Sequence, residues 1–142
     1  MFRTEFFSEV SARGLNIKRL ENFSKQAAKA LALKSSVNVI LTGAALITKL
    51  NRRFFLNAGL TDVIAFDLRA PQPLRQDKLC EVYVCLPAAR KSALMRGHSI
   101  TRELKILIVH GLLHLRGMGD ATPSSKKKML DEGDMLLKRL EK

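Results

Sequence analysis

Two of the three histidines in this chain, His110 and His114, stand four residues apart within the stretch HGLLHLRGMGD. On a helix this spacing places both imidazoles on one face, one turn apart, where two ring nitrogens can reach one metal ion. The residues around them, 106–115, are almost all apolar, so both rings must find polar partners where few exist. The pattern therefore favours a metal site over its alternative, two core histidines that bond to backbone carbonyls.

An aspartate follows the second histidine at a distance that suits a third ligand. Gly117 ends the expected helix, and Gly119 gives the backbone freedom to bring Asp120 back toward the two imidazoles. Three protein ligands with a fourth position open to water are typical of catalytic zinc sites, whereas structural zinc sites have four. We therefore expect one Zn²⁺ ion, or another divalent metal, held by His110, His114 and Asp120.

Four other residues bear on the possible chemistry of this site. Zinc peptidases place a glutamate directly after the first histidine as general base, and this chain has Gly111 there, which disfavours a protease. His98 precedes Ser99 in an expected turn, where we favour a structural role over a direct role in metal binding. Cys80 and Cys85 are five apart on an expected strand and point to opposite faces, so free thiols are expected.

The elements that must position this site follow from hydrophobic periodicity and turn residues. Ser99 is the expected N-cap of the helix that carries the two histidines, and Thr42 or Gly43 is the expected cap of the second helix. The pattern predicts strands at 2–8, 37–41, 62–68 and 79–86, and helices at 15–33, 44–57, 88–96, 100–116 and 123–140. We expect one α+β domain over residues 1–142, with a small mixed sheet of about four strands, helices packed on it and the metal site on a buried central helix.

Composition bounds the class of protein. Hydrophobic residues make up 46% of the 142 residues, which is enough for a core. Lysine and arginine number 25 against 13 acidic residues, a net charge of +12, which indicates a polyanionic partner such as nucleic acid, the alternative being a surface charged for solubility. No apolar run reaches the roughly 18 residues of a membrane span, and no signal core follows the N-terminus. We expect a cytoplasmic protein with no membrane partner.

Two blocks of the sequence resemble the YbeY family of bacterial metal-dependent endoribonucleases. RGHSITRELKILIVHGLLHLRG, residues 96–117, is similar to the family's signature region, and LNRRFFLNAGLTDVIAF, residues 50–66, is similar to its second block. LCEVYVC, residues 79–85, is a weaker likeness to a family strand. The order of expected strands and helices also matches over nearly the whole chain.

The resemblance implies a single-strand-directed endoribonuclease that acts in ribosomal RNA maturation, at the 3′ end of the small-subunit rRNA, and in ribosome quality control. It implies ribosomal RNA and the ribosome as partners, with ribosomal proteins as further candidates. Where the family has its third metal-site histidine, this chain has Asp120. Aspartate also ligates zinc, so the site is retained in principle.

A second departure concerns an arginine in the family's second block, whose position here is Phe55. Arg52 lies three residues earlier, on roughly the same helix face, and is the candidate catalytic arginine. Lys49 and Arg52 are the candidate RNA-phosphate contacts. Thr61 and Asp62 either orient groups behind the metal ligands or form a turn that closes helix 44–57 and begins a strand.

The aspartate at position 120 and the phenylalanine at position 55 also allow a second function. In that alternative the chain is a ribosome-assembly or RNA-binding factor with weak or no nuclease activity, and its metal is structural.

Overall fold

The computed structural model of the chain describes residues 2–55, 63–67, 79–119 and 121–141. These residues form four strands and five helices in the expected α+β order. Along the chain they are β1 (Thr4–Ser8), α1 (Ile17–Ala30), β2 (Ser36–Thr42), α2 (Ala44–Phe55), β3 (Val63–Asp67), β4 (Leu79–Cys85), α3 (Leu86–Arg96), α4 (Ile100–Leu115) and α5 (Pro123–Leu140). None of the helices within these ranges is both long and apolar enough to cross a membrane.

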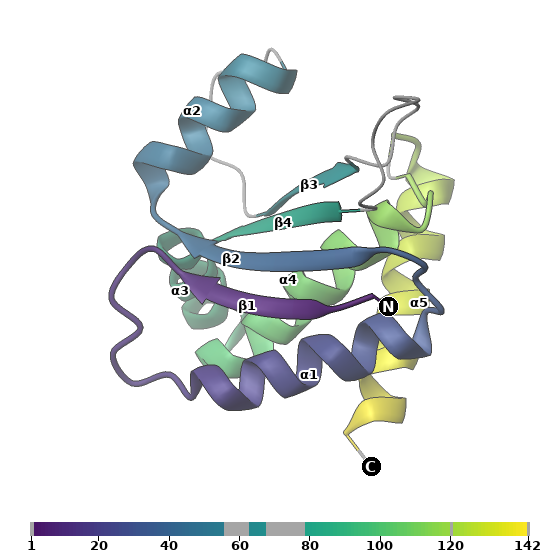
Figure 1. Ribbon diagram of the computed structural model, residues 1–142, viewed down its shortest axis with the longest axis horizontal. Coiled ribbons are helices and arrows are strands. Elements are labelled where there is room, and N and C mark those ends of the chain that lie inside the picture. Colours follow the sequence, from purple (N-terminus) through teal and green to yellow (C-terminus); the bar gives the residue numbers. More distant parts are fainter. Residues whose placement is uncertain (1, 56–62, 68–78, 120, 142) are drawn as a thin grey trace.

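The strands form one mixed sheet in the order β1-β2-β4-β3. β1, β2 and β4 run parallel, and β3 pairs with β4 in the antiparallel sense. Helices α1, α4 and α5 lie along one face of this sheet, and α2 stands on the other (Figure 1). The prediction of a small mixed sheet with helices packed on it is confirmed.

The core lies between the sheet and α4. Alternate side chains of the two central strands point toward this helix, and Val39 of β2 and Val82 of β4 are fully buried. From the helix, Leu104, Ile108 and Leu112 are equally buried. The apolar residues of α4 thus fill the centre of the domain, which confirms the expected buried central helix.

The two cysteines occupy opposite faces of the sheet, as alternation predicts. Cys80 belongs to the main core, whereas Cys85 packs with Ile47 and Ile64 in a second, smaller cluster under α2. Both thiols are free and buried. The expectation of two buried free thiols is confirmed.

Side-chain caps set where two of the helices begin. The Oγ atom of Ser99 accepts from the backbone N–H of Arg102 at 3.1 Å, which confirms Ser99 as the N-cap of α4. In α1 the side chain of Asn16 accepts from the N–H of Arg19 at 3.0 Å. The helix therefore begins at Ile17, two residues later than periodicity predicts, because the cap takes precedence over the apolar pattern.

Gly43, and not Thr42, supplies the first carbonyl of α2. The N–H of Ile47 donates to the Gly43 carbonyl at 3.3 Å. The Thr42 hydroxyl is buried and, within the described residues, has no hydrogen-bond partner. Of the two caps expected from the sequence, the structure selects Gly43.

Candidate metal centre

Helix α4 presents His110 and His114 together. Its last turn closes at Gly117, whose φ of 102° lies in the left-handed region that favours glycine. The N–H of Met118 then donates to the carbonyl of Leu113 at 3.1 Å, which ties the following chain back onto the helix. Both histidine side chains are half-buried, on the margin of the otherwise apolar helix.

The two imidazoles face one another at short range. Their Nε2 atoms are 3.1 Å apart. The rings stand edge to face, with an interplanar angle of 84° and centroids 4.7 Å apart. Helical spacing alone places two side chains near each other, but here it is the ring nitrogens that converge.

A backbone carbonyl fixes the tautomer of His114. Its Nδ1 atom lies 3.1 Å from the carbonyl oxygen of Met118. Because a carbonyl only accepts, Nδ1 carries the proton and donates, and Nε2 of the neutral ring carries the lone pair. That lone pair lies on the side of His110 Nε2, so the nitrogen with which His114 would bind a metal is the one that faces the other histidine.

This geometry fits a zinc-sized ion. Zinc binds imidazole nitrogen at about 2.0–2.1 Å in a tetrahedron, which separates two such nitrogens by about 3.3 Å. The 3.1 Å between the Nε2 atoms of His110 and His114 is close to that value. Metal-bound histidines usually donate their other ring N–H to a carbonyl or carboxylate, as His114 does to Met118. In the structure the two Nε2 atoms share a hydrogen bond, and the same two nitrogens are the pair that would hold the ion.

Asp120, the predicted third ligand, lies outside the described residues. Within the described ranges, no group of three His, Cys, Asp or Glu side chains is placed to hold a metal ion. The described part of the chain supplies the two histidines, and the ligand role of Asp120 stays a prediction.

Gly111 brings α4 against the sheet between the two histidines. A β-carbon built at this position would lie 2.5 Å from Cγ1 of Val82 and 3.3 Å from Cγ2 of Val63. A side chain therefore has no room here, and a glutamate in the position of the zinc-peptidase base is sterically excluded. The close packing of α4 on the sheet therefore explains why the chain has glycine at position 111, the residue that disfavours a protease in the sequence.

His98 is held away from the histidine pair by a buried carboxylate. Its Nε2 atom lies 2.6 Å from Oε1 of Glu103, whose side chain is fully buried. The other oxygen, Oε2, has no hydrogen-bond partner in the described residues, and Nη1 of Arg96 lies 3.6 Å from it, within ion-pair distance only. His98 thus joins the turn to the first turns of α4, in agreement with the structural role expected for it. Sequence reasoning missed Glu103 as its partner.

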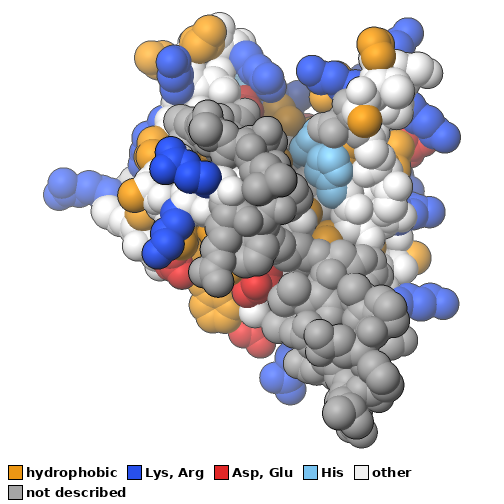
Figure 2. Space-filling view, turned by 90° about the horizontal axis from the view of Figure 1, so that it is seen from above, with side chains coloured by type: hydrophobic (Ala, Val, Ile, Leu, Met, Phe, Trp, Pro, Cys, Tyr) orange, Lys and Arg blue, Asp and Glu red, His pale blue; other side chains and the backbone are white. Residues whose placement is uncertain are grey.

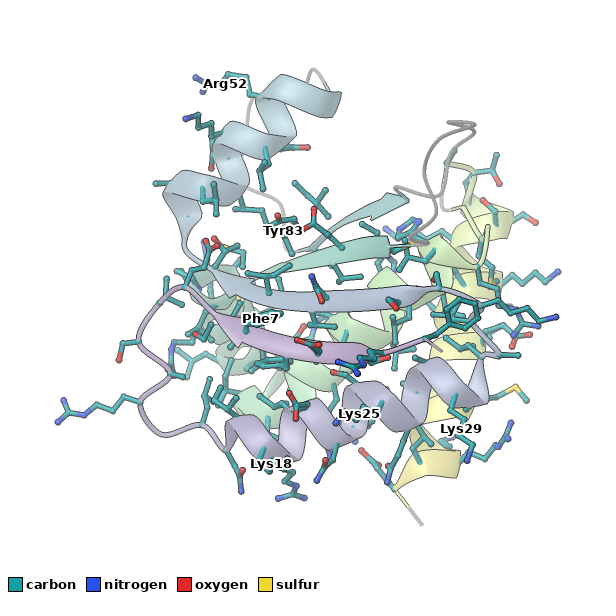
Figure 3. All side chains as sticks on the ribbon, in the orientation of Figure 1. Phe7, Lys18, Lys25, Lys29, Arg52 and Tyr83 are labelled. Carbon is teal, nitrogen blue, oxygen red and sulfur yellow. The ribbon has the colours of Figure 1, made fainter. Side chains whose placement is uncertain are left out.

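The candidate RNA contacts lie on a different helix. Lys49 and Arg52 are exposed on α2, which stands on the face of the sheet opposite α4. Figure 3 shows the Arg52 side chain at the outer end of α2, directed away from the sheet. Thr61 and Asp62 lie outside the described residues. The structure therefore does not bring Arg52 together with the histidine pair, and its catalytic role stays a prediction.

The histidine pair is open to solvent. Figure 2 shows histidine side chains exposed on this face of the molecule, with lysine and arginine side chains elsewhere on the same face. A small cavity of about 30 Å³ beside His110 runs between α4 and α5, where Leu130, Gly133 and Asp134 are among its lining residues.

Comparison with known proteins gives one consistent family. The model of the family described as Endoribonuclease YbeY matches residues 7–141. Endoribonuclease YbeY of Elusimicrobium minutum is 36% identical over 107 residues, which cover 74% of this chain and 75% of that protein. Endoribonuclease YbeY of Parafrankia sp. is 33% identical over 104 residues, which cover 67% of this chain and 65% of that protein. The chain thus spans about two thirds to three quarters of the length of these relatives.

A solved structure shares the fold. The solution structure of TM1509 from Thermotoga maritima superposes with a TM-score of 0.61 and covers 96% of this chain and 88% of its own. The two sequences are 23% identical, so this likeness supports the fold alone.

Proposed function

The chain belongs to the YbeY endoribonuclease family, which is metal-dependent and is involved in rRNA maturation, and from that premise we propose its substrate, metal and site. The substrate is single-stranded ribosomal RNA. The protein cuts it at the 3′ end of the small-subunit rRNA during maturation, and also acts in ribosome quality control. The metal is one Zn²⁺ ion. The protein works in the cytoplasm, in contact with the ribosome and ribosomal proteins.

One observation carries the proposal: the Nε2 atoms of His110 and His114 converge to 3.1 Å. A bound Zn²⁺ supplies a Lewis acid for a phosphoryl oxygen or an activated water. The two imidazoles hold it, and Asp120 is the proposed third ligand. The Met118 carbonyl keeps the proton of His114 on Nδ1, so that Nε2 stays available without a change of tautomer.

The other proposed residues bind and orient the RNA. Lys49 and Arg52, exposed on α2, neutralise phosphates of the strand. Thr61 and Asp62 precede β3 and orient the groups behind the ligands. Because α2 and α4 lie on opposite faces of the sheet, a bound strand has to pass the edge of the sheet to contact both.

The test is cleavage of a single-stranded RNA with the 3′ end of small-subunit rRNA, before and after treatment with a chelator. We expect cleavage by the wild type, loss with chelator, recovery on addition of Zn²⁺, and no cleavage by His114→Ala. Metal content separates the ligands: Asp120→Ala should bind less zinc than the wild type, and Asp120→His, which restores the family's residue, should bind as much or more. Cleavage that persists in chelator contradicts the proposal.

A second function is favoured by the direction of Arg52. Its side chain extends away from the sheet, and the family's arginine position is Phe55, so the chain can act instead as a ribosome-assembly factor with a structural metal. Under that function the RNA is bound in a salt-dependent way but is not cut, and His114→Ala lowers stability while RNA affinity is retained. The same cleavage and binding assays distinguish the two.

A further inference from the structure

A cavity of about 720 Å³ lies between the edge strand β1 and the C-terminal half of α1. Its lining includes an aromatic ring, an aliphatic side chain, a hydroxyl group and three cations: Phe2, Leu33, Ser35, Arg3, Lys25 and Lys29. The volume lies in the range of small-molecule sites. The cavity has no lining residue in common with the small cavity beside His110, so it is separate from the candidate metal centre.

The end of α1 forms a preformed wall of this cavity. The N–H of Leu33 donates to the carbonyl of Ala28 at 3.1 Å, and the N–H of Ala32 donates to the carbonyl of Lys29 at 2.9 Å. These two bonds make a Schellman closure, in which the residue between helix and loop adopts a left-handed conformation. Here that residue is Ala32, with φ 53°. The closure holds Leu33 against the end of the helix.

Two lysines supply positive charge from α1. Lys25 and Lys29 are one helical turn apart and exposed, and like charges at this spacing repel one another. Glu21 lies 3.6 Å from Lys25, but the same carboxylate also lies 3.6 Å from Lys18 and accepts from the backbone N–H of Phe6. No carboxylate of the described residues lies within ion-pair distance of Lys29. An anion between the two ammonium groups relieves their repulsion.

The other charged side chains of the lining offset one another at the rim. Side chains alternate along a strand, and Phe6 is buried toward the helices. Arg3 and Glu5 therefore project from the opposite face of β1, side by side. Their charges cancel, and the α1 side of the cavity is positive because of Lys25 and Lys29.

Phe2 adds a flat apolar surface to this positive wall. Its side chain is 49% exposed. An aromatic ring beside lysines is the combination with which proteins hold nucleotides, because the base stacks on the ring and the cations neutralise the phosphate. An inorganic anion leaves the ring unused, and an uncharged apolar molecule leaves the lysines unused.

Ser35 is a second, independent feature of this wall. Its side chain is on the helix side of the sheet, because Val37, two residues later, is buried in the main core. Ser35 is only 3% exposed, and its hydroxyl has no hydrogen-bond partner within the described residues. A buried hydroxyl without a partner is destabilising. An oxygen atom at the floor of the cavity would supply the missing partner.

We propose that this cavity binds a nucleotide, with the phosphate at Lys25 and Lys29 and the base stacked on Phe2. A free nucleotide and one nucleotide of a single RNA strand both carry this chemistry. They differ in the phosphate, which has two charges in the free nucleotide and one in the strand. The site requires neither a metal ion nor nuclease activity.

The experiment is equilibrium dialysis of the full chain in the presence of a chelator, which keeps the histidine pair free of metal. The ligands are adenosine 5′-monophosphate, ribose 5-phosphate, and a tetra-adenylate with hydroxyl groups at both ends. We expect saturable binding of the monophosphate, and binding of ribose 5-phosphate that is about tenfold weaker because it lacks the base. Tighter binding of the monophosphate than of the tetra-adenylate assigns the site to a free nucleotide, and the reverse order assigns it to RNA.

Two double variants with equal change of charge test the phosphate contacts. Lys25→Gln with Lys29→Gln should weaken binding of the preferred ligand about tenfold. Lys126→Gln with Lys127→Gln, on exposed positions of α5, should leave it unchanged.

Single variants test the ring and the hydroxyl. Phe2→Ala should remove the preference for the monophosphate over ribose 5-phosphate while ribose 5-phosphate binds as before. Ser35→Ala should weaken nucleotide binding several-fold, yet should not lower stability to urea, because it removes an unpaired buried hydroxyl.

Three outcomes overturn the proposal. One is equal nucleotide binding by the wild type and by Lys25→Gln with Lys29→Gln, or equal weakening by the α5 control. Another is equal wild-type affinity for the monophosphate and ribose 5-phosphate, which would mark a site for anions alone. The third is the absence of saturable binding of both the monophosphate and the tetra-adenylate.

Discussion

Replacement of Gly111 by alanine tests how closely α4 lies on the sheet at the histidine site. The added β-carbon would lie 2.5 Å from Cγ1 of Val82, a side chain that is fully buried, and 3.3 Å from Cγ2 of Val63. Rotation of Val82 gives little relief, because its second methyl, Cγ2, is also 3.3 Å from the same point. Either α4 or β4 has to shift.

Two opposing effects set the magnitude. Alanine in a helix interior is more favourable than glycine by about 1 kcal/mol. Overpacking of a core costs about 1–3 kcal/mol, and more when the neighbours cannot yield. Because the shortest contact is with the buried side chain of Val82 on β4, we expect overpacking to exceed propensity, with a net loss of about 1–2 kcal/mol in the free energy of unfolding.

Urea unfolding followed by far-ultraviolet circular dichroism measures this loss. Gly133→Ala in α5 is the matched control, because its β-carbon would meet Cγ1 of Val109 at an ordinary 3.6 Å, so it should gain up to about 1 kcal/mol from propensity. In a Val82→Ala background both contacts with Val82 are removed and only the 3.3 Å contact with Val63 remains, so Gly111→Ala should cost much less than in the wild type. The reasoning fails if Gly111→Ala is as stable as the wild type, or if its cost is the same in both backgrounds.

The remaining predictions concern ionisation and the buried carboxylate. Burial, the charge of Glu81, a hydrogen bond in which the phenol donates to Glu81, and the charge of Glu9 raise the pKa of Tyr83. The phenolate absorbance of Tyr83 should titrate with a midpoint of about 12 in the folded protein, and a midpoint near 10 would contradict this prediction. Because the pKa in the folded protein exceeds the ordinary 10.0, the tyrosine stabilises the fold below pH 10, and this contribution is lost as the pH rises toward 12. Desolvation raises the pKa of Glu21, but Lys25, the Phe6 backbone N–H and Lys18 outweigh it and leave this pKa below 4.5. Its stabilising contribution is therefore present above that pH and lost as pH falls through the lowered value, so the stability difference between wild type and Glu21→Gln should shrink on acidification, and a constant difference would count against this. His98→Ala removes the 2.6 Å hydrogen bond to buried Glu103 and should cost about 1–3 kcal/mol in urea unfolding while zinc affinity is retained; unchanged stability would refute the role of this pair.

The helix with the two histidines was predictable because its signals are local. Four-residue spacing, an apolar run and the Ser99 cap all act within one or two turns, and the structure confirms each of them. The same local reasoning placed the start of α5 at Pro123, where the helix begins, but did not identify Thr122 as its N-cap, which forms a capping box with Ser125.

Contacts between elements were not predictable from the sequence. The order β1-β2-β4-β3 sets α2 opposite α4, and no local pattern states which face a helix covers. For that reason Arg52 was expected near the metal site, whereas the structure directs it outward from α2. The close approach of Gly111 to Val82 and the bond between His98 and Glu103 likewise depend on distances across the fold.

The most direct test of the central claim is the zinc affinity of the purified chain, measured by competition with a chromophoric chelator. We predict that His110→Ala and His114→Ala each lower the zinc affinity by more than about 100-fold, because each removes a ligand. Loss of a residue that only hydrogen-bonds to a ligand lowers metal affinity by about 10- to 100-fold. His98→Ala, which changes the histidine held by Glu103, should bind zinc as the wild type does. Wild-type affinity in His114→Ala would contradict the assignment of the converging imidazoles as the metal site.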